Sequence, residues 1–197
     1  MNMSASPLTL LKQGARDTLD GFRRRWYFLI VVACAVLIDQ LTKLLAVTYL
    51  RPVTDVPLWD GVLHLHYTTN PGAAFGMMGD TRWIFLVVSG VAIPVMLIYL
   101  FIRKGRTPLF DWGLALVIGG GIGNMIDRLG FGLDPEKPSQ VVDFIYFKLI
   151  DFAIFNGADT FVCVGAGIMI LALTLDLVRE AKAHRKAKDG SSHTCGE

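Results

Sequence analysis

Two aspartates, Asp143 and Asp159, stand in apolar surroundings with no basic residue within four positions of either. A buried carboxylate without a cation has a raised pKa, and two such groups that face each other share one proton. One group can then take a proton from water while the other protonates a carbonyl, which is the chemistry of an aspartic protease. An alternative remains open, in which Asp143 is a solvated strand acid and Asp159 is an acid favoured by a helix N-terminus.

Other polar side chains lie inside apolar stretches, where their burial is costly and a functional role is the first interpretation. Asp39 and Lys43 are four residues apart on one helix face, and we interpret them as an ion pair that joins helices. Asn124 and Arg128 lie near the end of another apolar stretch. The guanidinium of Arg128 could hold a neighbouring backbone or a substrate carbonyl, and the sequence leaves both roles open.

The sequence predicts neither a metal site nor an organic cofactor. His64 and His66 share one face of a predicted strand but have no third ligand nearby, which fits a metal site poorly. Ser89 has no histidine close in sequence, so a serine triad has little support.

The elements that must position these residues are predicted to cross a membrane. Of the 197 residues 53% are hydrophobic and 18% charged, which is more apolar surface than one soluble core of this size would bury. The net charge of +2 is too small to indicate nucleic-acid binding. Four stretches have the length of transmembrane helices, at residues 26–49, 83–102, 109–129 and 155–178. The third is rich in glycine, which predicts an interior helix that another helix or a substrate helix can approach closely.

Basic residues set the expected orientation of these spans. They cluster before the first span, between the second and third, and after the fourth. By the positive-inside rule both termini and the short link are cytoplasmic, and the segments 50–82 and 130–154 lie outside. Strands are expected at 62–67 and 141–147, near the membrane surface.

We therefore predict an all-α transmembrane fold, a four-helix membrane bundle with a small outer β element. Three parts are expected along the chain: an interfacial segment over 1–25, a membrane domain over 26–178, and a polar, disordered cytoplasmic tail over 179–197.

Five motifs, taken in order, resemble the lipoprotein signal peptidase (signal peptidase II) family. They are Asp39-Gln40-Leu41-Thr42-Lys43, Asn70-Pro71-Gly72-Ala73-Ala74-Phe75-Gly76, Gly120-Gly121-Ile122-Gly123-Asn124-Met125-Ile126-Asp127-Arg128, Val142-Asp143-Phe144 and Phe155-Asn156-Gly157-Ala158-Asp159. The resemblance implies a bacterial inner-membrane aspartyl endopeptidase that cuts prolipoproteins before a cysteine carrying a diacylglyceryl group.

The resemblance also implies roles for individual residues. The catalytic pair would be Asp143 and Asp159, the same two acids that lack a local cation. Substrate-binding or supporting roles would fall to Asp39, Lys43, Asn70, Gly72, Asn124, Arg128 and Asn156. The expected partners are a lipidated prolipoprotein and membrane lipid.

Two departures from the family pattern stand out, and one rival function remains. The segment 130–140 looks long for the link before Asp143, and Gly157 stands where a larger apolar residue is common, which could loosen the start of the last helix. The rival is a small transporter or proton-conducting protein with a relay of ionisable side chains across the bilayer. We expect ionisable side chains only in the outer halves of the spans, which disfavours such a path.

Overall fold

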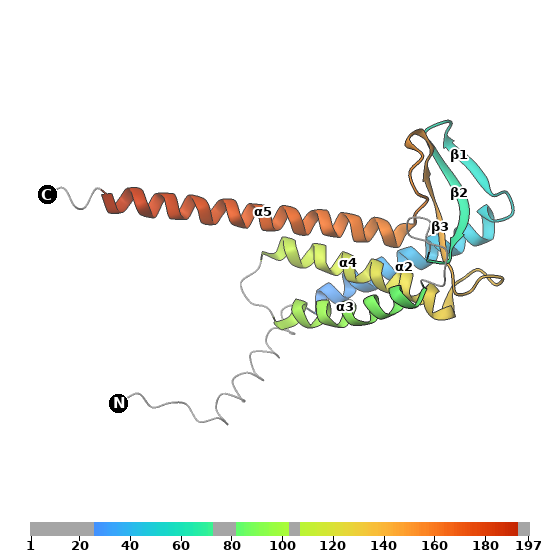
Figure 1. The fold of residues 1–197 in the computed structure, drawn as a ribbon, viewed down its shortest axis with the longest axis horizontal. Coiled ribbons are helices and arrows are strands. Elements are labelled where there is room, and N and C mark those ends of the chain that lie inside the picture. Colours follow the sequence, from blue (N-terminus) through green and yellow to red (C-terminus); the bar gives the residue numbers. More distant parts are fainter. Residues whose placement is uncertain (1–25, 73–81, 103–106, 193–197) are drawn as a thin grey trace, which may run out of the picture.

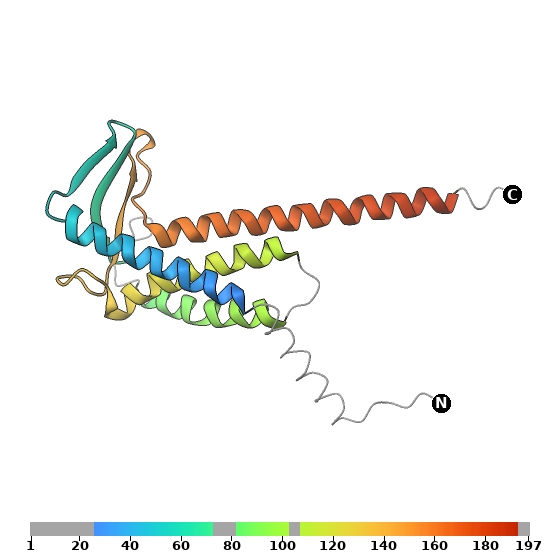
Figure 2. The same ribbon diagram turned by 180° about the vertical axis from the view of Figure 1, so that it is seen from behind.

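The computed structural model describes residues 26–72, 82–102 and 107–192, and the fold below refers to these ranges. In chain order the elements are α2 (Tyr27–Leu45) continued by the π-helical turn η1 (Ala46–Leu50), β1 (Asp55–Trp59), β2 (Leu63–Asn70), α3 (Arg82–Ile102), α4 (Pro108–Ile126) continued by the π-helical η2 (Asp127–Phe131), β3 (Val141–Phe147), the 3₁₀ turn η3 (Lys148–Ile150) and α5 (Gly157–Ser192). Figure 1 shows the helices running alongside one another with the sheet at one end, and Figure 2 shows the same arrangement from behind.

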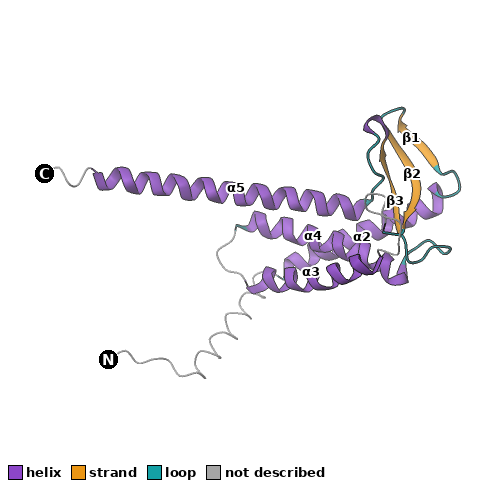
Figure 3. Cartoon of the chain, in the orientation of Figure 1, coloured by secondary structure: helices purple, strands orange, loops and turns teal. Residues whose placement is uncertain are grey.

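Four helical segments are long and apolar enough to cross a membrane, which confirms the expected number of spans among the described residues. They are Tyr27–Leu50, Arg82–Ile102, Pro108–Phe131 and Gly157–Arg185. The fold is mostly helical with one small sheet (Figure 3), as expected from the sequence. The predicted interfacial segment over 1–25 lies outside the described residues.

The stretch 179–192 is helical, so the prediction of a disordered tail beginning at residue 179 is wrong for this part. Helix α5 continues without a break to Ser192. This stretch is rich in Ala, Lys and Arg, which favour helix. Extending an existing helix also avoids the unfavourable nucleation step.

Helix α4 lies against α2, α3 and α5, and its glycines explain how closely they approach. A Cβ added to Gly120 would lie 2.3 Å from the carbonyl oxygen of Ala158 on α5, and one added to Gly119 would lie 2.6 Å from Ala35 Cβ on α2. The predicted interior position of this helix is therefore confirmed. At these two glycines the close neighbour is a helix of the chain itself, which leaves no room for a substrate helix there.

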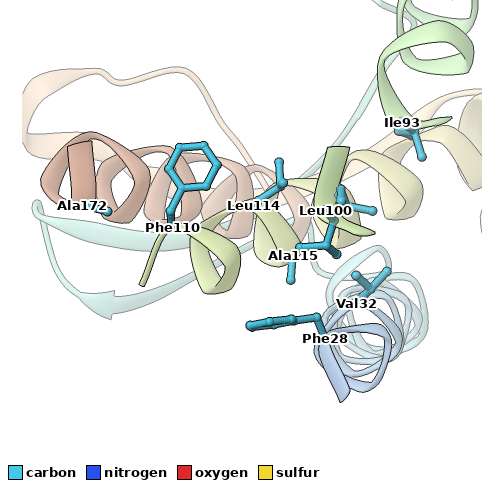
Figure 4. Close-up of a cluster of buried hydrophobic side chains, with 9 residues drawn as sticks. Phe28, Val32, Ile93, Leu100, Phe110, Leu114, Ala115 and Ala172 are labelled. Atoms are coloured by element: carbon cyan, nitrogen blue, oxygen red, sulfur yellow. The ribbon is translucent and has the colours of Figure 1, made fainter. Parts of the chain in front are cut away.

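Away from the sheet, large apolar side chains fill the space between the helices. Phe28 and Val32 of α2 pack with Leu114 and Ala115 of α4, and all four are buried (Figure 4). Burial of such side chains supplies packing contacts between helices. The cluster holds together the half of the helices that is remote from the sheet.

The sheet is antiparallel, in the order β1-β2-β3. Two of its strands match the predicted ones, whereas β1 was missed. Pro57 lies in the middle of β1, and proline argues against a strand except at a sheet edge. β1 is such an edge strand and all of its residues are exposed, so it lacks the apolar alternation that marks a half-buried strand.

Candidate functional site

The first turn of α5 holds Asp159, and Asn156 caps this turn. The backbone N–H of Asp159 donates to Asn156 Oδ1 at 3.0 Å, and the backbone N–H of Asn156 donates to Asp159 Oδ2 at 3.2 Å. This reciprocal pair satisfies donors that a helix start leaves free. Just upstream, Phe155 pairs with Ile145 of β3. The start of α5 is thereby held beside β3.

Asp143 lies on β3 opposite Thr68 of β2 and is only 3% exposed. Asn156 Nδ2 donates to Asp143 Oδ1 at 2.6 Å, and the side chain of Asn70 makes a further hydrogen bond to this carboxyl group. Burial, and then the negative charge of Asp159, raise the pKa of Asp143 to about 7 although both hydrogen bonds act in the opposite direction. Asp143 therefore retains a proton up to near-neutral pH.

Asn124 of α4 connects this pair of acids to α2. Its Nδ2 donates to Asp159 Oδ1 at 2.8 Å, while its Oδ1 accepts from Asn156 Nδ2 at 3.1 Å and from Lys43 Nζ at 2.9 Å. Because Asn156 Nδ2 and Lys43 Nζ donate to one end of the Asn124 amide and Asp159 Oδ1 accepts from the other, the orientation of this amide is determined. Both oxygens of Asp159 are thus engaged as acceptors.

Neither acid forms a direct ion pair in the described part of the chain, although the charge of Arg128 acts on both. The ion pairs there include none with Asp143 or Asp159. Their ligands are instead neutral donors, chiefly the amides of Asn156 and Asn124. The two acids are linked through Asn156, and the negative charge of Asp159 acts on Asp143.

A buried charge cluster lies beneath Asn124. Lys43 Nζ lies 2.8 Å from Asp39 Oδ2 and 2.8 Å from Asp127 Oδ2, and all three side chains are fully buried. Asp39 Oδ1 also accepts from the backbone N–H of Ala158 at 2.8 Å. The expected pair of Asp39 and Lys43 is therefore formed, and it joins α2 to both α4 and α5 directly behind the acids.

Two members of this cluster, Gln40 and Asp127, were not among the expected site residues. Gln40 Nε2 donates to Asp39 Oδ2 at 3.1 Å and to Asp127 Oδ1 at 3.3 Å. The sequence did contain a signal for Asp127. This residue follows Asn124 by three positions and so lies on the same helix face, and polar side chains within transmembrane spans usually have a structural or functional role.

Arg128 lies over a ring of α3. Its guanidinium carbon is 4.7 Å from the centroid of Phe85, and its Nη1 lies 3.5 Å from the backbone oxygen of Asn124. Its Nε is buried and has no hydrogen-bond partner among the described residues. The charges of Asp159 and Asp143 both act on it. Arg128 thus brings a donor without a partner close to the acids.

Gly72 closes the turn that follows β2. Its backbone N–H donates to Asn70 Oδ1 at 2.8 Å, and its φ of 106° belongs to the region that favours glycine. This bond orients the Asn70 side chain that contacts Asp143. The remaining residues of this motif, 73–76, lie outside the described residues.

Gly157, at the first position of α5, packs against α2. A Cβ there would lie 3.3 Å from Thr42 Oγ1 and 3.5 Å from Asp39 Oδ1. The small residue fits the close approach of the two helices, and the capping bonds of Asn156 and Asp159 around it are formed.

The two histidines of β2 bind a shared carboxylate. Asp55 accepts from His64 Nδ1 at 2.9 Å and from His66 Nδ1 at 3.1 Å. Among the described residues, no group of three or more His, Cys, Asp or Glu side chains is placed to hold a metal.

The expectation that no ionisable side chain lies near the opposite ends of the spans is wrong. Asp111 is in the first turn of α4, only 4% exposed, and Asp176 lies in the second half of the α5 span. An acid in the first turn of a helix is favoured by the helix dipole, which accounts for Asp111. The distribution of charge therefore excludes the rival transporter less sharply than expected.

Comparison with known proteins identifies the family. The sequence model of the family described as "Signal peptidase (SPase) II" matches residues 31–175. The chain belongs to the signal peptidase II family. It is 42% identical to the lipoprotein signal peptidase of Caldanaerobacter subterraneus, over 72% of this chain and 91% of that protein. It is 40% identical to that of Brevibacillus brevis, over 77% of this chain and 96% of that protein.

Solved structures share the fold of this chain. Two structures described as a bacterial membrane enzyme are 26% and 25% identical to the chain, with TM-scores of 0.62 and 0.64. They cover 77% and 75% of this chain, and 89% and 92% of their own chains are matched. The family membership predicted from the motifs is confirmed, and the chain is a multi-pass membrane protease.

Proposed function

We propose that this protein is an aspartic endopeptidase that removes the signal peptide from diacylglyceryl-modified prolipoproteins, cutting on the N-terminal side of the lipidated cysteine. The observation that supports it most is that Asn156 binds both Asp143 and Asp159, which form no direct ion pair among the described residues. The names of the curated relatives support the substrate class.

The surroundings of the two acids suggest different roles for them. Asp159 accepts on both oxygens and lies in the first turn of a helix, which suits a carboxylate. Asp143, with its pKa raised to about 7 by burial and by Asp159, suits a protonated acid. Asp159 is therefore the general base, and Asp143 is the general acid.

The reaction proceeds in two proton-balanced steps. Asp159 takes a proton from water as the water oxygen bonds to the scissile carbonyl carbon, and Asp143 gives its proton to the carbonyl oxygen. The resulting tetrahedral diol collapses when the bond to the cysteine nitrogen breaks. Asp159 returns its proton to that nitrogen, and Asp143 recovers a proton from the diol hydroxyl. Both groups end in their starting states.

Arg128 binds the substrate backbone in this proposal. Its buried Nε has no hydrogen-bond partner among the described residues, while its ring contact with Phe85 holds the guanidinium in place. A peptide carbonyl is a natural acceptor for this donor. The contact would align the scissile bond with the two acids.

The placement of charge suggests how the enzyme sits in its membrane. Basic clusters flank the spans at the ends remote from the sheet, so both termini would be cytoplasmic and the acids would lie near the outer face of a bacterial inner membrane. At that depth the diacylglyceryl chains of a substrate remain in lipid while water reaches the acids.

The test is a cleavage assay read by mass spectrometry. Purified protein in detergent is given one prolipoprotein with and without its diacylglyceryl group, alongside Asp159→Asn. Asp151→Asn serves as control, because Asp151 is an exposed acid whose side chain accepts a hydrogen bond from the Tyr146 hydroxyl. Cleavage of the lipidated form by the wild type and Asp151→Asn, but not by Asp159→Asn, is expected. Cleavage by Asp159→Asn would overturn the proposal, and no cleavage by folded wild type would turn attention to proton flux in liposomes.

A further inference from the structure

The segment between η2 and β3, residues 132–140, folds into a closed loop. The backbone N–H of Gly132 donates to the carbonyl oxygen of Pro138 at 2.9 Å, and that of Gln140 donates to Lys137 O at 3.0 Å. Val141, the first residue of β3, follows directly. A change in the position of this loop would therefore also move the start of the strand that carries Asp143.

Asp134 fastens this loop from within. The residue is only 2% exposed, and its Oδ1 accepts from the backbone N–H groups of Glu136 and Lys137 at 2.8 and 3.3 Å. Its Oδ2 accepts from the Tyr67 hydroxyl of β2 at 2.5 Å. One buried carboxylate thus organises the loop and attaches it to the sheet.

Arg51, just after η1, completes the attachment. Its Nη2 lies 2.5 Å from Glu136 Oε1 and its Nη1 lies 3.7 Å from Asp134 Oδ1. The loop is thereby tied to the end of α2 as well as to β2. Although burial raises it, the hydrogen bonds from Tyr67 and from the loop backbone lower the pKa of Asp134, so it acts as a carboxylate acceptor.

The attachment point is close to Asp143 along the sheet. Tyr67 precedes Thr68, which pairs with Asp143, and Asn70, which bonds to Asp143, follows three residues after Tyr67. The β2 and β3 segments around Asp143 are therefore connected in two ways. They pair through the backbone hydrogen bonds of the sheet, and Tyr67 of β2 also binds the loop that leads into β3. A general acid needs such fixed geometry to keep its hydrogen bonds and its burial.

We propose that Tyr67, Asp134 and Arg51 form a latch that sets the position of Asp143, and that Tyr67 and Asp134 are positioning residues for the reaction. This inference rests on the proposed function. A loosened latch lets water reach Asp143 and weakens its alignment, while the acids themselves remain in place.

The charged groups that face Asp143 come from three helical elements: Lys43 on α2, Arg128 on η2 and Asp159 on α5. None of them is altered by removing the Tyr67 hydroxyl. A shift in the pH dependence of cleavage therefore reports the solvation of Asp143. A general loss of stability would reduce the amount of active enzyme without moving the pH limb.

The test compares Tyr67→Phe with Tyr146→Phe. Each variant removes one hydroxyl that binds an acid, but Tyr146 binds the exposed Asp151 at 2.6 Å, away from the loop. We expect Tyr67→Phe to lower kcat about tenfold with KM within about twofold, as for loss of one hydrogen bond to a charged group. Its alkaline pH limb should move to lower pH, because a more solvated Asp143 loses its proton earlier. Tyr146→Phe should match the wild type.

The design separates this inference from the proposed function. If the wild type cleaves and Asp159→Asn does not, the function stands whatever the latch variants do. An unmoved pH limb in folded Tyr67→Phe, or equal effects of the two tyrosine changes, would overturn the latch alone. Asp134→Asn combined with Tyr67→Phe should cost less than the sum of the two single changes, since both weaken the contact between Tyr67 and Asp134, although Asp134→Asn also weakens the pairing with Arg51. Additive losses would contradict it.

Discussion

Lys43 and Asn124, 81 residues apart in the sequence, meet in a buried hydrogen bond of 2.9 Å that leaves the Asn124 Nδ2 pointing at Asp159. The ammonium can only donate, so it fixes Asn124 Oδ1 as the acceptor and the other end of the amide as the donor. The buried charge cluster behind the acids thereby determines which end of the Asn124 amide faces Asp159. A neutral amide, and not the cation itself, is presented to the carboxylate.

Asn124→Asp tests this orientation. An ionised aspartate at 124 still accepts from Lys43 and Asn156 but no longer donates to Asp159, and we expect cleavage at pH 7 to fall about 10- to 100-fold. Part of the loss should be recovered at lower pH, where an acid at 124 is protonated and donates again. The measurement is kcat against pH for both proteins. Activity equal to that of the wild type at pH 7 would show that the donor is unimportant.

The raised pKa of Asp143 predicts the alkaline limit of activity. Burial and Asp159 raise it to about 7, and the proposed general acid must be protonated, so cleavage should decline as pH rises through about 7. The check is a profile of kcat/KM with a substrate that has no group titrating in this range. A rate that stays constant up to pH 9 would contradict the role of Asp143 as acid.

The same shift predicts how the stability of the protein depends on pH. Because the pKa of Asp143 is raised from 3.8 to about 7 on folding, the folded state binds more protons between these values, and stability is lost as pH rises through that window. Asn carries no charge at any pH. Asp143→Asn should therefore raise the Tm relative to the wild type more at pH 8 than at pH 5, as measured by thermal unfolding in detergent. A difference independent of pH would refute this linkage.

The sequence revealed the spans and the two least compensated acids, because hydropathy and missing neighbours are local properties. Asp143 and Asp159 stand out for this reason, and their roles remain a prediction. What the sequence did not reveal depends on contacts distant in the chain. Asp127 contacts Lys43 and Gln40 only once α2 has packed against the end of α4. Asp134 binds Tyr67 only once its loop has packed against β2.

A second limit concerned residues whose local pattern misleads. Pro57 argued against a strand, although it lies in the edge strand β1. The glycines of α4 suggested room for a substrate helix, whereas two of them lie against α2 and α5. Backbone approach of this kind depends on which helix arrives, which no residue type specifies alone.

Removing the cation of the buried cluster should be costly. Lys43→Met leaves Asp39 and Asp127 buried together without compensation, and we expect a loss of about 3–5 kcal/mol in the free energy of unfolding. The control is Arg179→Met, because Arg179 forms an exposed pair with Asp176 at 3.2 Å, for which about 0–1 kcal/mol is expected. Both are measured by denaturant titration in the same detergent. Equal effects would mean that the cluster contributes little.

The packing of α4 on α5 can be tested by adding one methyl group. In Gly120→Ala the new Cβ would lie 2.3 Å from the carbonyl oxygen of Ala158, and a backbone atom cannot move aside as a flexible side chain can. The helices must separate, and we expect a loss of about 1–3 kcal/mol or more. Separation would also displace Asp159, which follows Ala158 directly, so kcat should fall as well. In Gly167→Ala the Cβ meets no atom within 4 Å, so this variant should keep both stability and activity. If Gly120→Ala unfolds and cleaves like Gly167→Ala, the close contact between α4 and α5 is not needed to place the acids.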